Sequence, residues 1–209
     1  MAGGCCESQC AVGDNSPRFR RALWIALGVN AAMFCVELAG GFAASSVSLL
    51  ADSADFLGDA ANYGVSLAVF SHGLVWRSRA ALVKGLTMAG FGLFVLGKTV
   101  WQIHLGILPE PATMGVIAVL ALIANASVAL MLYAFRNGDA NMRSVWLCSR
   151  NDAIGNVAVM LAAAGVFAIG QAWPDLIVAG IMGMLALASG VSVVRQARQE
   201  LATVARAAG

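Results

Sequence analysis

The sequence predicts an all-α integral membrane protein with six transmembrane helices. Hydrophobic residues make up 60% of the 209 residues and charged residues only 11%, whereas a typical soluble domain carries roughly 25% charged residues. The mean hydropathy is +0.80. The apolar residues fall into six long stretches separated by short polar segments, which leaves little chain for a soluble domain.

Each apolar stretch is long enough for the ~20 helical residues that cross the hydrocarbon core. The first is too long for a signal peptide and contains Asn30 and Glu37, so we expect an uncleaved span. Serines, prolines, and charged or glycine-containing turns, one of them at residues 76–79, separate the stretches. The expected spans are, in order, residues 21–44, 47–72, 81–104, 112–135, 143–169 and 174–194.

Basic residues gather on one side of the predicted membrane, and only Lys98 falls toward the other side. Because Lys and Arg favour the cytosolic side, we expect both termini in the cytosol, with the protein in the cell (inner) membrane. The net charge of +2 is too small to indicate a nucleic-acid partner. The residues on the cytosolic side are Arg18, Arg20, Arg21, Arg77, Arg79, Lys84, Arg136, Arg143, Arg150, Arg195, Arg198 and Arg206.

The predicted spans divide the chain into three parts. Residues 1–20 form a cytosolic tail, residues 21–195 form the six-helix transmembrane domain, and residues 196–209 form a short cytosolic tail. The first tail contains three cysteines, Cys5, Cys6 and Cys10, which either capture a soft metal ion or are simply reduced thiols.

The second span carries Asp52, Asp55 and Asp59 within an apolar sequence. At i, i+3 and i+7 these residues lie on one stripe of a helix. Ionisable side chains are rare at membrane depth and usually serve ion or proton pathways. Asp52 taken alone fits a helix-packing role equally well.

Two pairs at i, i+4 spacing indicate a metal site. Asp55 and Asp59 share one face of the second span, and Cys148 and Asp152 share one face of the fifth. Two helices that each give two ligands can enclose one divalent ion in a tetrahedral shell, which suits Zn²⁺, and a thiolate also suits Cd²⁺. Without metal, neighbouring buried carboxylates take up protons, and metal binding then releases them. This exchange is the chemical basis of a proton antiporter.

The fifth-span pair leaves alternatives open. Asp152 has Asn151 and Asn156 nearby and could serve only in hydrogen bonding. A lone cysteine such as Cys148 in an apolar helix is more often a small buried hydrophobic residue than a metal ligand.

The motifs resemble those of the cation diffusion facilitators, proton-coupled exporters of zinc and related divalent metals. Residues 30–41 resemble the family's Asn…Phe…Glu-x-x-Gly-Gly first helix, and Asn125 matches a recurrent Asn of the fourth. Residues 49–59, Leu-Leu-Ala-Asp-Ser-Ala-Asp-Phe-Leu-Gly-Asp, are similar to Leu-Leu-Ala-Asp-x-x-[His/Asp]-x-x-x-Asp. Residues 148–157 resemble His-x-x-x-Asp-x-x-Gly-[Ser/Asn]-Val, with Cys148 in place of the His.

The resemblance implies a Zn²⁺/Cd²⁺:H⁺ antiporter that exports metal from the cytosol, with the metal as substrate, no permanently bound cofactor and no enzymatic activity. The family's cytosolic C-terminal domain is not found after the sixth span, so we expect a minimal form. We expect it to form a homodimer through its transmembrane helices, in the lipid bilayer. The alternatives are an intramembrane aspartyl-type hydrolase, with two aspartates sharing a proton, and a membrane metal sensor that does not transport.

Overall fold

The computed structural model describes residues 17–69, 74–135 and 140–208, and these residues form six α-helices and no strand. The predicted fold class is confirmed. In chain order, the helices are α1 (Pro17–Ala43), α2 (Val47–Val69), α3 (Leu74–Leu105), α4 (Pro111–Tyr133), α5 (Ala140–Ile169) and α6 (Trp173–Ala208).

Among the described residues, five helices are long and apolar enough to cross a membrane. The exception is α2, because three aspartates interrupt its apolar sequence. Large apolar side chains point outward along the other helices; Phe167 is 79% exposed and Leu130 is 76% exposed. A surface of this kind is stable in contact with lipid rather than water. The prediction of a multi-pass membrane protein is confirmed.

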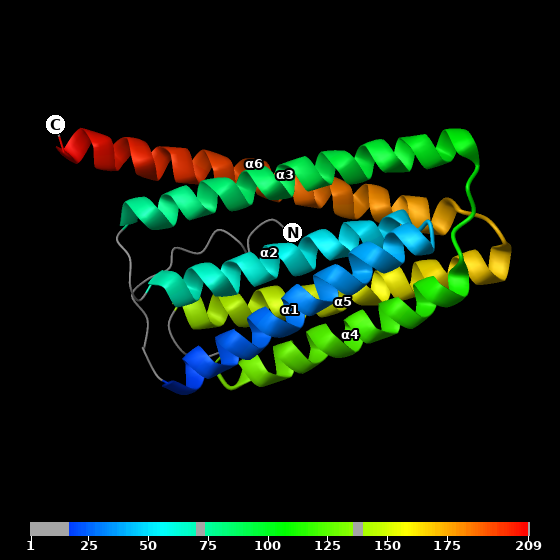
Figure 1. Ribbon diagram of the computed structural model, residues 1–209, viewed down its shortest axis with the longest axis horizontal. Helices are drawn as coiled ribbons and strands as arrows, with labels where there is room; N and C mark the ends of the chain where they lie inside the picture. The colour runs from blue at the N-terminus through cyan, green and yellow to red at the C-terminus, as the bar shows by residue number, and fades with distance from the viewer. Residues whose placement is uncertain (1–16, 70–73, 136–139, 209) are drawn as a thin grey trace.

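The helices form two groups, as Figure 1 shows: α3 and α6 lie side by side, next to a bundle of α1, α2, α4 and α5. Glycines allow α3 and α6 to touch backbone to backbone. A Cβ atom added at Gly190 of α6 would lie 2.5 Å from the backbone nitrogen of Ala89 on α3. Close approach through small residues is a common way for helices to pack in a membrane.

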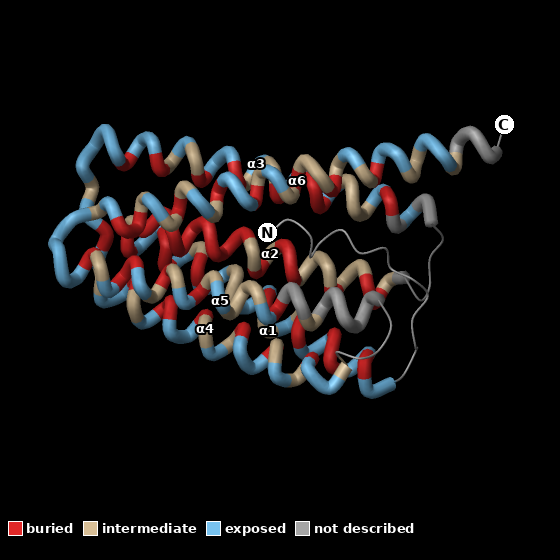
Figure 2. The backbone as a smooth tube through the Cα atoms, turned by 180° about the vertical axis from the view of Figure 1, so that it is seen from behind, coloured by how far each residue is buried: buried red, intermediate tan, exposed pale blue. Residues whose placement is uncertain are grey.

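The second helix occupies the centre of the molecule, where it contacts each of the other five. Residues 46–54 are buried without interruption, and Figure 2 shows this part of α2 in red while the outer faces of the surrounding helices are pale blue. Leu49 packs with α4 and α5, whereas Leu50 packs with α3 and α6. Of the acidic residues of α2, Asp52 and Asp59 are therefore buried in the protein, whereas Asp55 is half-buried.

Two helices, α3 and α6, extend farthest beyond the apolar stretches that predicted them. The prediction of a turn at residues 76–79 is wrong, because α3 already begins at Leu74 and includes these residues. The last helix continues to Ala208. Neither extension contains a glycine or proline, and arginine is a good helix former, so the change from apolar to charged residues does not end the helix.

Candidate metal centre

Two of the predicted ligands come together where α2 packs against α5. Asp59 of α2 is 6% exposed, and the carboxyl group of Asp152 on α5 lies within hydrogen-bonding reach of it. Two ionised carboxyl groups within hydrogen-bonding reach repel each other unless a proton or a cation lies between them. The packing of α2 on α5 thus creates a site that needs either a proton or a cation.

Tyr63 fixes the orientation of Asp59. Its hydroxyl group donates a 2.8 Å hydrogen bond to Oδ2 of Asp59, one helical turn away, and lies 2.7 Å from Oγ of Ser149 on α5. Tyr63 and Ser149 are both buried. This link joins α2 to α5 beside the two carboxyl groups and limits the rotation of the Asp59 side chain.

The other two predicted ligands are placed differently. Asp55 is half-buried and lies within electrostatic range of Glu37 on α1. Cys148 belongs to α5, but its side chain lies outside the described residues, as do Cys5, Cys6 and Cys10. Within the described part of the chain, no three His, Cys, Asp or Glu side chains form a group that could hold a metal ion. Among the described side chains, the structure therefore brings Asp59 and Asp152 together, and Asp55 does not join them as a third ligand.

A second acidic group lies between α1 and α2. Glu37 and Asp52 are 0% and 1% exposed, and their negative charges interact. The two carboxyl groups lie within hydrogen-bonding reach of each other, and no described N–H or O–H group donates to either oxygen of Glu37. A buried carboxylate without a donor is costly, so protonation or a bound cation is needed to stabilise this pair.

Buried amide groups extend the polar interior of the four-helix bundle. Asn30 of α1 donates a 2.8 Å hydrogen bond to the carbonyl oxygen of Ala26, and its own oxygen has no partner among the described residues. The side-chain oxygen of Asn125 on α4 and both polar side-chain atoms of Asn156 on α5 also have no hydrogen-bond partner among the described residues. Such atoms are usually satisfied by water, so the bundle offers a polar interior through an otherwise apolar protein.

Lys84 is a charged neighbour of this centre that the sequence analysis did not identify. The charge pattern groups it with the basic residues of the predicted cytosolic side, but it is 9% exposed and donates a hydrogen bond to Oδ1 of Asn62 on α2. Its charge acts on Asp59. The available signal was its position: Lys84 lies inside the apolar stretch predicted for residues 81–104 rather than at its end.

A helical bundle with lipid-facing apolar helices and carboxyl groups buried at its centre defines a polytopic membrane protein with an interior polar centre. The family model described as the cation efflux transmembrane domain matches residues 23–202. The chain therefore belongs to the cation efflux family, the cation diffusion facilitators that its motifs resemble, as predicted.

Several characterised relatives have similar sequences. The chain is 25% identical over 194 residues to the "Cadmium, cobalt and zinc/H(+)-K(+) antiporter" of Bacillus subtilis (strain 168), covering 84% of this chain and 61% of the relative. It is 26% identical over 179 residues to the "Metal cation efflux system protein CzcD" of Cupriavidus metallidurans, covering 80% and 57%. It is 27% identical over 194 residues to the "Zinc transporter ZitB" of Escherichia coli (strain K12), covering 87% and 62%. The chain thus spans about three fifths of the length of these relatives.

Proposed function

We propose that this protein exports divalent metal ions, Zn²⁺ and Cd²⁺, from the cytosol in exchange for protons. The observation that carries the proposal is the approach of Asp59 on α2 to Asp152 on α5 within a membrane-embedded bundle. Carboxylates at this separation can hold either a dication or a proton, and this choice is what an antiporter needs. The names of the relatives, which include zinc and cadmium transport and antiport, support the same function.

In the proposed cycle, metal from the cytosol displaces protons from the aspartates, with Asp55 and Cys148 as further ligands. Asp55 is four residues from Asp59, and Cys148 is four residues from Asp152, so each pair has the helical spacing for two ligands of one ion. The helices then move to expose the ion to the other side, where incoming protons release it. The metal is the substrate and not a resident cofactor, and the protein is not an enzyme.

From the distribution of the basic residues we also propose that both termini lie in the cytosol and that the protein resides in the inner membrane. A homodimer formed through the transmembrane helices is part of the proposal, and lipid covers the remaining apolar surface. Neither alternative function is favoured by an observation on this molecule: the family and its named relatives are transporters, which supports neither a hydrolase nor a sensor.

The test is metal flux into proteoliposomes that contain the purified protein and a metal-sensitive dye. We expect Zn²⁺ and Cd²⁺ flux to depend on an imposed pH gradient and to disappear in Asp59→Asn, which keeps the shape of the side chain and removes its charge. Asp139→Asn, which changes an acid outside the predicted spans, is the matched control and retains flux. A K⁺ gradient applied at equal pH separates proton coupling from potassium coupling.

Normal flux in Asp59→Asn would show that the metal does not pass through the proposed centre. Metal binding without flux in the wild-type protein would instead favour a sensor. Cys148→Ala then tests the fourth ligand: a larger loss of Cd²⁺ flux than of Zn²⁺ flux is expected if the thiolate coordinates, because a soft ligand favours the softer ion.

A further inference from the structure

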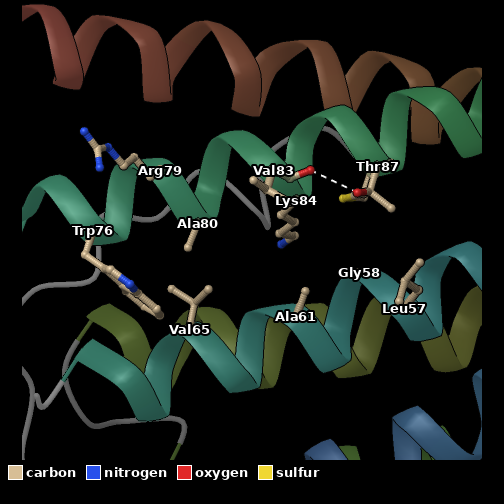
Figure 3. Close-up of a pocket in the computed structure, with 11 residues that line it drawn as sticks. Leu57, Gly58, Ala61, Val65, Trp76, Arg79, Ala80, Val83, Lys84 and Thr87 are labelled. Carbon is tan, nitrogen blue, oxygen red and sulfur yellow. Dashed lines mark hydrogen bonds between the residues drawn. The ribbon is translucent and has the colours of Figure 1, made fainter. Parts of the chain in front are cut away.

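A cavity of about 530 Å³ lies between α2 and α3. The small residues Gly58 and Ala61 line its wall on α2. They are three residues apart and therefore lie on one face of the helix. Lys84 lines the opposite wall, and Figure 3 shows its side chain pointing from α3 toward α2. The small side chains on α2 leave room for the lysine to reach that helix.

The end of the Lys84 side chain is held in place. Its Nζ atom donates a hydrogen bond to Oδ1 of Asn62, which is three residues after Asp59 and therefore on the same stripe of α2. The side chain is 9% exposed, so this contact is shielded from bulk solvent. A buried charge is costly unless another charge compensates it, and the charge of Lys84 acts on Asp59.

The charge of Lys84 affects how tightly the neighbouring carboxylates bind a cation. A positive charge bound to Asn62, one turn from Asp59 along α2, attracts Asp59 when the centre holds no metal and repels a dication when one arrives. In a partly dehydrated site this repulsion is screened less than at the protein surface. A transporter needs such a limit on affinity, because an ion that binds too tightly is not released.

We propose that Lys84 is a tethered cation that lowers the affinity of the Asp59–Asp152 centre for the transported dication and so promotes its release. It is a positioning residue that acts through electrostatics and does not coordinate the metal. The inference rests on the proposed function, since it assigns a role relative to the same metal centre.

The experiment is a titration of the full-length protein in detergent with chelator-buffered Zn²⁺ at about pH 8, where protons compete least. We expect Lys84→Met and Lys84→Gln to bind Zn²⁺ about tenfold more tightly than the wild type. Lys84→Arg, which keeps the charge, should bind as the wild type does. Lys98→Met removes a lysine farther along the same helix and should also leave the affinity unchanged.

These variants distinguish an effect of the Lys84 charge on Zn²⁺ affinity from an effect on the fold. Lys84→Gln keeps a donor for Asn62 without the charge, and a gain in affinity cannot result from a damaged fold. Equal or weaker binding in both neutral variants overturns the role of Lys84. Asp59→Asn in parallel tests the centre itself: if it binds Zn²⁺ normally, the proposed function is wrong, whereas lost binding in Asp59→Asn with no gain in the lysine variants overturns only the inference about Lys84.

Discussion

Asp175, in the first turn of α6, accepts a 2.6 Å hydrogen bond from the hydroxyl group of Ser48 at the start of α2. The same carboxylate accepts hydrogen bonds from the hydroxyl group of Ser46 and from the backbone N–H groups of Val47 and Ser48. The first N–H groups of a helix have no partners within it, and a carboxylate is well suited to accept from them. Here the capping residue comes from a different helix, so α6 and α2 are joined at this end.

We expect Asp175→Ala to destabilise the protein strongly. The change leaves two buried hydroxyl groups and two backbone N–H groups without their acceptor, at a cost on the order of 3 kcal/mol. The measurement is thermal unfolding in detergent, followed by circular dichroism. Glu110→Ala is the control, because Glu110 caps only its own helix, α4, at an exposed position. A loss in Asp175→Ala no larger than in the control would contradict the role of Asp175 in joining two helices.

Tyr63→Phe should weaken metal binding while leaving the fold intact. The buried ring is kept, but Asp59 loses the hydroxyl group that donates to its Oδ2 atom. Groups that orient a ligand in this way typically change metal affinity by about tenfold or more. A Zn²⁺ titration of the purified variant measures the change. Tyr133→Phe, at an exposed position on α4, should behave as the wild type; equal affinities in all three proteins would show that Asp59 does not need Tyr63.

Gly190→Ala should disturb the packing of α6 on α3. The added methyl group meets the backbone nitrogen of Ala89 at 2.5 Å, and a backbone cannot move aside as a side chain does. Overpacking of this kind costs about 1–3 kcal/mol. Gly180→Ala on the same helix has nothing within 4 Å of the new atom and should be neutral or slightly stabilising. Thermal unfolding of the two variants side by side tests the contact, and equal stability would contradict it.

Glu37→Gln should raise the stability of the metal-free protein. The amide keeps the size of the side chain and is always neutral, whereas the buried carboxyl group beside Asp52 must take up a proton when the metal-free protein folds. The gain should be on the order of 1 kcal/mol. The midpoint of thermal unfolding in a metal chelator measures it, with Glu7→Gln in the predicted N-terminal tail as the control. A lower midpoint in Glu37→Gln would show that the charge itself stabilises the bundle.

Much of the molecule could be predicted because the deciding properties are local to one helix. Hydropathy identifies the apolar stretches, and a spacing of three or four residues places side chains on one face whatever the helix packs against. For this reason Asp55 and Asp59 could be assigned to one face of α2, and the family could be identified from short motifs. The same reasoning failed at residues 76–79, where a charged sequence predicted a turn and the helix continues.

The set of helices, their membrane character and the acidic residues of α2 and α5 could therefore be predicted from the sequence alone. The packing of the helices determines three further features: α3 pairs with α6, Lys84 bonds to Asn62 of α2, and Asp175 of α6 caps α2. Those relationships depend on which helices are neighbours and how each is rotated about its axis. Helix packing fixes both through contacts between residues far apart in the chain, and no periodicity within a single helix specifies them.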